Sequence, residues 1–200
     1  MNRLLLTLTM AFGILFTVGL WMPLKAWMAQ ELLTLAWAES QARQQPARPW
    51  PWADTWPVAQ LELPGLNEPL IVLDGVHGES LAFGPGLVPG SGGFRATVIA
   101  GHRDTHFRAL ADLKTGDPLR LQDRRGDWIG YEVVRTRIVD SRSAFLDMDA
   151  LAPNSLLLVT CYPFDSLDAS GPLRYLVEAR PQTELPLVGT PGANVADAGF

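Results

Sequence analysis

The sequence predicts a mainly β domain, a closed or nearly closed barrel of short strands, preceded by an N-terminal transmembrane helix. Of its 200 residues, 48% are hydrophobic and 18% are charged, and 18 are glycine and 16 proline. This composition is too apolar for a disordered chain and too rich in helix breakers for a helical bundle. The length allows one domain with short appendages. Beyond Pro57, short apolar runs alternate with Gly, Pro, Asn and Asp, which is typical of many short strands.

The transmembrane helix is predicted from an uncharged apolar run over residues 4–22. At about 1.5 Å per residue, this run spans the ~30 Å hydrocarbon core of a membrane. Arg3 precedes it and Lys25 follows it, a slight bias that favours a cytoplasmic N-terminus. We expect residues 1–24 to be a signal anchor in contact with lipid, in a single-pass inner-membrane protein whose domain faces the periplasm or outside.

A cleavable signal peptide is the alternative to this anchor. Ala36-Trp37-Ala38 has the small-x-small form that signal peptidase recognises. However, this site lies far beyond the apolar run, which is itself long for a signal peptide. An uncleaved anchor is therefore favoured.

Residues 25–57 are predicted to form a juxtamembrane helix followed by an extended strap. Residues 24–44 continue with the helix-favouring Ala, Leu, Glu, Gln and Met. Prolines and tryptophans then crowd residues 45–57, which forbids a regular helix. We expect the strap's tryptophans to pack across the outside of the domain or to lie at the membrane interface, in preference to forming a ligand-binding cage.

The β domain is predicted over residues 58–181, and residues 182–200 read as a C-terminal tail with little pattern. Its strand segments are alternating or continuously apolar. No gap between them holds a convincing long helix, although residues 106–113 and 145–151 each allow a turn or two. The predicted strands are residues 58–63, 69–73, 95–100, 118–122, 128–138, 155–161 and 173–179.

Charge and cysteine content exclude several classes of protein. Sixteen basic and 21 acidic residues give a net charge of −5, with no run of Lys or Arg, so no nucleic-acid partner is expected. Cys161 is the one cysteine, which excludes an internal disulfide and any cluster of several thiolates. An exported chain that keeps an unpaired thiol accepts a redox liability, so the thiol indicates a function.

Three candidate functional residues lie at the ends of predicted strands: His102, Cys161 and Arg174. If the last two strands are consecutive and antiparallel, Cys161 and Arg174 become neighbours. A guanidinium near a thiol favours the thiolate and stabilises an oxyanion during acyl transfer, and an imidazole supplies proton transfer. Singly, these residues also fit a small buried thiol, a surface or ion-paired arginine and a turn histidine. Their conjunction favours a cysteine nucleophile.

Two other motifs point to chemistry more weakly. His102 and His106 have the spacing of a zincin motif, to which Asp104 and Cys161 would add ligands. However, Arg103 stands where that motif has its Glu general base, and the segment follows a strand. We therefore expect no metal site and no cofactor. A glycine-rich run before the histidine segment lacks the Gly-Lys-Ser/Thr ending of a phosphate loop.

With His102, Cys161 and Arg174 in this order on an anchored small β domain, the chain resembles the sortases, which are cysteine transpeptidases of bacterial surfaces. Leu157-Leu158-Val159-Thr160-Cys161 keeps the Leu, Thr and Cys of the family's Thr-Leu-x-Thr-Cys strand, with Leu157 in place of the first Thr. Arg174 follows at the start of the last strand, as in the family. Residues 100–107 and the Gly84-Pro85-Gly86 loop are also similar. The strap over residues 49–57 resembles the strap found in the sortase branch of Gram-negative bacteria.

The resemblance covers roughly residues 24–180 and implies an eight-stranded sortase barrel. It implies that Cys161 attacks a backbone carbonyl in the C-terminal sorting motif of another exported protein. A surface amine acceptor, or water, then releases the thioester. His102 is the implied proton donor and acceptor, and Arg174 the partner of the oxyanion or substrate carbonyl. Thr160 is expected to help position substrate, and Asp104 to orient His102.

Substrate selection in this family lies in the loop before the cysteine strand, here residues 141–154. Its Ala144, Phe145 and Leu146 are expected to line an apolar pocket.

Two rival classes remain as alternatives. An L,D-type cell-wall transpeptidase carries a His-Gly-Cys signature, but Val159 and Thr160 precede Cys161 here. The other rival is a non-catalytic membrane-tethered β module in which Cys161 is only part of the core.

Overall fold

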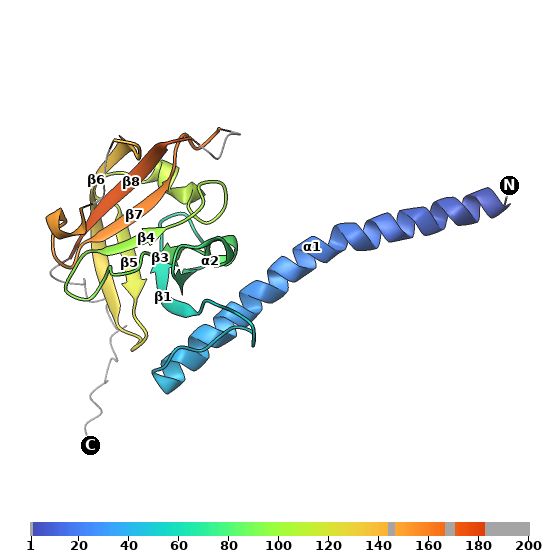
Figure 1. The fold of residues 1–200 in the computed structure, drawn as a ribbon, viewed down its shortest axis with the longest axis horizontal. Helices are drawn as coiled ribbons and strands as arrows, with labels where there is room; N and C mark the ends of the chain where they lie inside the picture. Colours follow the sequence, from blue (N-terminus) through green and yellow to red (C-terminus); the bar gives the residue numbers. More distant parts are fainter. Residues whose placement is uncertain (1, 144–146, 167–170, 183–200) are drawn as a thin grey trace, which may run out of the picture.

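A closed eight-stranded barrel forms the body of the protein in the computed structural model, which describes residues 2–143, 147–166 and 171–182 (Figure 1). The strand order around the barrel is β1-β2-β3-β4-β7-β8-β6-β5. This architecture confirms the predicted fold class. The strands are β1 (Pro57–Glu62), β2 (Leu70–Asp74), β3 (Gly86–Leu87), β4 (Thr97–Ala100), β5 (Pro118–Gln122), β6 (Trp128–Asp140), β7 (Leu156–Cys161) and β8 (Leu173–Pro181). The helices are α1 (Asn2–Arg43), α2 (Gly78–Phe83), η1 (Arg108–Asp112) and η2 (Met148–Ala150).

The seven strands predicted from the sequence all form, each within two residues of its predicted ends. The prediction missed β3, a two-residue strand that pairs parallel with β2 and antiparallel with β4. Gly86 sits there against the Gly75 carbonyl, with no room for a Cβ between them. A strand this short has no period to detect, and its existence depends on tertiary contact.

Two apolar clusters lie on opposite faces of the strands that carry the candidate residues. Inside the barrel, Leu156 and Leu158 of β7 pack with Ile99 of β4 and Val177 of β8. Outside it, the buried residues Val98, Leu157 and Leu176 form a second cluster. Successive side chains of a strand point to opposite faces, so each strand contributes to both clusters.

The connection from β6 to β7 covers the outer cluster. Both strands are antiparallel to β8, which lies between them, so they run parallel to each other and their connection has to return past β8. Met148 and Leu151 of this connection pack against the outer cluster. The connection is therefore held against the face on which β7 ends.

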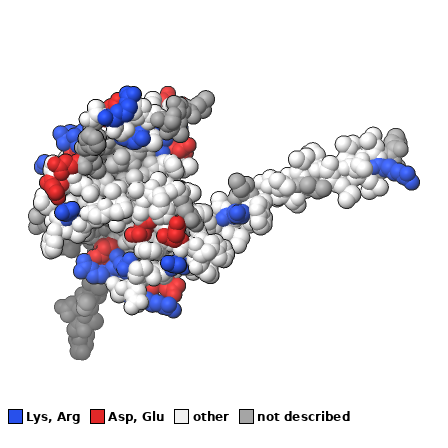
Figure 2. All heavy atoms as spheres, in the orientation of Figure 1, with Lys and Arg blue, Asp and Glu red and all other residues white. Residues whose placement is uncertain are grey.

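Helix α1 runs without a break through the two segments that the sequence separates into a transmembrane helix and a juxtamembrane helix (Figure 1). Its first part stands away from the barrel with its described side chains exposed, and from Ala29 onwards one side is buried. By length and composition the apolar part is able to cross a membrane. Figure 2 shows it as a stretch without charged side chains between basic groups.

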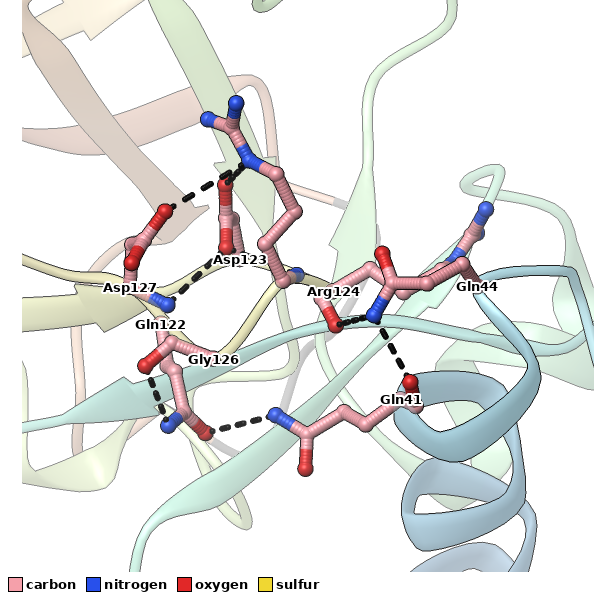
Figure 3. Close-up of polar contacts among 8 residues, drawn as sticks. Gln41, Gln44, Gln122, Asp123, Arg124, Gly126 and Asp127 are labelled. Carbon is pink, nitrogen blue, oxygen red and sulfur yellow. Dashed lines mark hydrogen bonds and ion pairs between the residues drawn. The ribbon is translucent and has the colours of Figure 1, made fainter.

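The C-terminal part of α1 is fixed to the barrel by apolar and polar contacts. Leu33 and Trp37 pack in a buried cluster against β2. At the helix end, Gln41 Nε2 donates to Gln122 Oε1 (3.2 Å) and Gln44 Nε2 to the Arg124 carbonyl (3.1 Å), as Figure 3 shows. These bonds attach α1 to the hairpin between β5 and β6.

The strap returns along the outside of the domain after α1 ends. Trp50 contacts Phe83 of α2 edge-on, with ring centroids 5.0 Å apart. Ala53 and Thr55 are buried, and the Thr55 hydroxyl donates to the Asp74 carbonyl (2.9 Å). Trp52 is exposed. The strap therefore joins α1, α2 and the end of β2.

Candidate active site

The strand register brings the three candidate residues to one end of three neighbouring strands. Cys161, the last residue of β7, is paired with Arg174 of β8. On the other side of β7, the parallel strand β4 pairs Ala100 with Val159, and Gly101 N donates to the Val159 carbonyl (3.1 Å). His102 lies two residues after Ala100, and Cys161 lies two residues after Val159. The antiparallel arrangement predicted for Cys161 and Arg174 is thus the one that forms.

Cys161 continues the outer face of β7. Leu157 and Val159 belong to the outer cluster, and the alternation of side chains places Cys161 on the same face. Leu157 is fully buried, whereas Val159 and Cys161 are only partly buried. The cover over this face therefore thins toward the thiol, which leaves Cys161 accessible at the end of the strand.

Thr160 faces the opposite way and is buried. Its hydroxyl donates to the Gly101 carbonyl at 2.7 Å, a bond that ties the end of β7 to the residue before His102. Gly101 is itself pressed against Phe107, since a Cβ there would lie 2.9 Å from the buried Phe107 ring. Thr160 thus contacts the backbone of the histidine segment, and its side chain does not share the face on which Cys161 lies.

Arg174 is partly buried beside Cys161, and its guanidinium is held by the backbone before it. Nη1 donates to the Gly171 carbonyl (2.6 Å) and to the Leu173 carbonyl (2.9 Å). Among the described residues, no carboxylate forms an ion pair with it. These bonds occupy one nitrogen of the fork, so the other donors and the positive charge are available for a ligand at the end of β7.

An aromatic cluster stiffens the same end of the barrel. Tyr162 stacks on Tyr175 with ring centroids 6.2 Å apart, and Phe164 contacts the Tyr175 ring edge-on at 5.1 Å. Tyr162 follows Cys161 and Tyr175 follows Arg174. The rings therefore fix the backbone next to both candidate residues.

His102 and Asp104 are both exposed in the loop after β4. In the described structure no hydrogen bond joins their side chains. The His102 carbonyl accepts from Phe107 N (3.0 Å), which closes the loop into a compact turn. An orienting role for Asp104 stays a prediction.

His106, the second histidine of this segment, is half-buried and close to His102. Burial lowers the pKa of His106 below its ordinary value of 6.5, and the proximity of His102 lowers it further, while a hydrogen bond with the Phe83 backbone acts in the opposite direction. The neutral form is therefore favoured at neutral pH. A neutral His106 adds no positive charge beside His102.

Arg103 was missed as a candidate, because the sequence showed only that it replaces the Glu of a zincin motif. Its side chain is 5% exposed although both of its neighbours in the chain are exposed. Nη2 donates to the Ser166 carbonyl at 2.8 Å, in the connection between β7 and β8. Nothing in the local sequence pattern signals this burial.

The connection before β7 begins at the same end of the barrel. Ser141 N and its hydroxyl both donate a hydrogen bond to the Pro172 carbonyl (2.9 and 2.8 Å), two residues before Arg174. Met148 and Leu151 lie on the outer cluster. The predicted pocket residues Ala144, Phe145 and Leu146 lie outside the described residues.

Comparison with known proteins gives the family of this chain. The family model of the sortase domain matches residues 61–182, which is more than half of the chain. The chain belongs to the sortase family. Sortases are cysteine transpeptidases, and the match spans all three candidate residues.

Similar sequences and structures agree with this assignment. The chain is 36% identical over 122 residues to Sortase D of Bacillus subtilis (strain 168), an alignment that covers 58% of this chain and 60% of that sortase. The chain thus spans less than two thirds of the length of this relative. Sortase A from Corynebacterium diphtheriae is similar in structure, with 28% identity, a TM-score of 0.56 and coverage of 68% of this chain and 65% of that one.

A Sortase D5 transpeptidase of Clostridium perfringens shares the fold at 19% identity and a TM-score of 0.57, covering 78% of this chain and 98% of that one. These comparisons leave the assignment to the Gram-negative branch as a proposal.

Proposed function

We propose that this sortase is a membrane-anchored cysteine transpeptidase that cleaves the C-terminal sorting motif of an exported protein and transfers the acyl group to an amine, or to water. The observation that carries the proposal is the register of β4, β7 and β8. It supports placing an imidazole, a thiol and a guanidinium together at one end of an outer face. This set of groups is what nucleophilic acyl transfer requires.

The first half-reaction forms a thioester. The Cys161 sulfur attacks the scissile carbonyl carbon, a C–S bond forms, and the thiol proton is taken up by His102. The C–N bond then breaks, and His102 returns a proton to the leaving amine. The oxyanion that develops between these steps accepts hydrogen bonds from the free guanidinium donors of Arg174.

The second half-reaction regenerates the thiol. An amine of the acceptor attacks the thioester carbon and gives its proton to His102, and the C–S bond breaks as the new C–N bond forms. The sulfur regains its proton, and water in place of the amine gives hydrolysis. Thr160 acts in both halves as a positioning residue, because its hydroxyl holds the segment that carries His102.

We propose that substrate lies on the outer face beside the β6–β7 connection, with Ala144, Phe145 and Leu146 as part of its pocket. Support comes from Met148 and Leu151, which pack on the outer cluster and place this connection next to β7. The motif itself would run along the face that leads to Cys161.

The location follows from α1. Residues 4–22 cross the inner membrane, and the barrel faces the periplasm or outside, where exported substrates and amine acceptors meet. The basic residues at both ends of the apolar run and the Pro/Trp-rich strap support this location and membership in the branch of Gram-negative bacteria. A deletion of residues 1–24 is expected to keep full peptide cleavage in solution, since the residues of known exposure that it removes are all exposed.

Labelling of Cys161 distinguishes the enzyme from a non-catalytic module. A thiol-reactive sulfone is expected to modify Cys161 in the native chain, with a rate that depends on pH, because a nucleophile must ionise in an accessible position. A core thiol would react only after denaturation. Labelling of the denatured chain alone would therefore overturn the proposal.

A further inference from the structure

We propose that Arg103 is a positioning residue for the sortase reaction, which fixes His102 by binding the connection between the two strands that carry Cys161 and Arg174. The proposal rests on the proposed function, because His102 has its role only there. The contact that supports the proposal directly is the hydrogen bond that Arg103 Nη2 donates to the Ser166 carbonyl.

Arg103 is buried in a loop whose neighbouring residues are exposed. Its side chain is 5% exposed, while His102 and Asp104 on either side are exposed. Burying a guanidinium costs free energy unless its donors are bound, so burial at this position needs a compensating contact. The Ser166 carbonyl, 63 residues further along the chain, supplies one at 2.8 Å.

The contact of Arg103 with Ser166 adds to two other restraints on the histidine segment. Before His102, Gly101 is bonded to the Val159 carbonyl and to the Thr160 hydroxyl, both on β7. After His102, Arg103 is bonded to the segment that follows β7. His102 is therefore held on both sides by the same stretch of chain that carries Cys161.

The chemistry of arginine suits this contact. The Ser166 carbonyl lies in the connection between β7 and β8, outside the strand pairing of the barrel. The planar guanidinium presents several donors with a fixed charge and is less strongly hydrated than an ammonium group, so it suits such a buried site better than lysine does. Glutamine in the same place has donors in its amide, but its side chain is shorter and uncharged, so it lacks the reach and the charge of the guanidinium.

The expected consequence is a loss of proton transfer with little loss of binding. A general acid or base works within hydrogen-bond reach of its partner, and a misplacement of about 1 Å costs on the order of 10²-fold in rate. Arg103→Gln is therefore expected to lower kcat between about 10-fold and 100-fold and to leave KM within about twofold. Arg103→Lys, which keeps the charge and a donor, is expected to fall between this variant and the wild type.

The test uses the full chain in detergent micelles and reads His102 directly. The sequence has three histidines, so their ring signals in a ¹H–¹³C NMR spectrum are assigned with single His→Gln variants. In Arg103→Gln, the His102 ring signal is expected to shift. Arg108→Gln is the matched control, since Arg108 is exposed in the same segment. An unchanged His102 ring signal in folded Arg103→Gln would overturn the inference.

Kinetics separate a failure of this inference from a failure of the proposed function. The probe is a fluorogenic peptide spanning the sorting motif of an exported protein of the same bacterium, chosen because the wild-type chain cleaves it and Cys161→Ala does not. Absence of any such peptide contradicts the proposed function. Wild-type kcat in Arg103→Gln with this peptide contradicts only the role of Arg103.

The lysine variant keeps the inference testable if Arg103→Gln does not fold. A folded Arg103→Lys with a lowered Tm, but with wild-type kcat and an unchanged His102 spectrum, would assign Arg103 to stability alone. A lowered kcat with an altered His102 signal would support positioning.

Discussion

The two faces of strand β7 differ in what surrounds them, although their residues alternate along six positions of one chain. Leu156, Leu158 and Thr160 face the packed interior of the barrel. Leu157, Val159 and Cys161 face outward, where the cover thins toward the strand end. Neighbours in sequence thus differ in environment and share only backbone geometry. The interior face therefore fixes the position of the thiol, while the outer face provides access to it.

The largest effect is expected from the thiol on the outer face of β7. Cys161→Ala is expected to abolish peptide cleavage, because no other thiol in the chain can form a thioester. Its free energy of unfolding should stay within about 1 kcal/mol of the wild type, since the side chain is only partly buried. Peptide turnover and a urea unfolding curve measure the two quantities. Turnover by the alanine variant would exclude the cysteine mechanism.

Arg174, paired with Cys161, tests what the second strand adds. If its guanidinium binds the oxyanion, Arg174→Lys should lose on the order of 10²-fold or more in kcat/KM, and Arg174→Ala should lose still more. If it only favours the thiolate, lysine should restore most activity, and alanine should move the pH profile upward. The pH dependence of kcat/KM for both variants decides between these roles.

Leu158, on the interior face, is expected to show the opposite behaviour. Leu158→Ala leaves a cavity in the barrel core and should cost about 2–5 kcal/mol in the free energy of unfolding. Activity per folded molecule should remain close to that of the wild type, because the side chain points away from the thiol. A variant that is folded but inactive would show that the interior face does more than support the strand.

Thr160 faces inward with the core residues of β7 and yet contacts the histidine segment. Thr160→Val removes the donor to the Gly101 carbonyl and is expected to cost about 1–3 kcal/mol in stability. It should also lower kcat by roughly 10-fold, because the His102 segment loses one restraint. Thr160→Ser keeps the donor and is the control. Equal kcat in the valine and serine variants would limit Thr160 to the core.

The sequence predicted most of the barrel because its strands carry a local pattern. Residues 118–122 are predicted and observed with the same bounds, since apolar side chains alternate there over a clear period. β3 and α2 were missed because a two-residue strand and a six-residue helix have too few positions for a pattern, and tertiary contacts decide them.

The candidate site was predictable where chemistry coincides with strand ends. Cys161 and Arg174 needed only the assumption of an antiparallel pair, which the register bears out. Two other features depend on contacts between distant residues. Thr160 faces the interior of the barrel, where its hydroxyl binds the Gly101 carbonyl. Arg103 is buried where its guanidinium binds the Ser166 carbonyl. Neither was inferred from the residue types alone.

The unbroken helix α1 connects the apolar segment rigidly to the barrel. Because residues from Ala29 onwards are clamped to the barrel, turning the exposed part of the helix about its axis turns the barrel with it. Each added residue would rotate the barrel by about 100° and raise it by about 1.5 Å. If residues 4–22 lie in a bilayer, as proposed, the helical phase sets the direction in which the thiol faces relative to the membrane segment, and the helix length sets its height above the bilayer. The substrates that the thiol is able to reach therefore depend on the length of α1 as well as on the site.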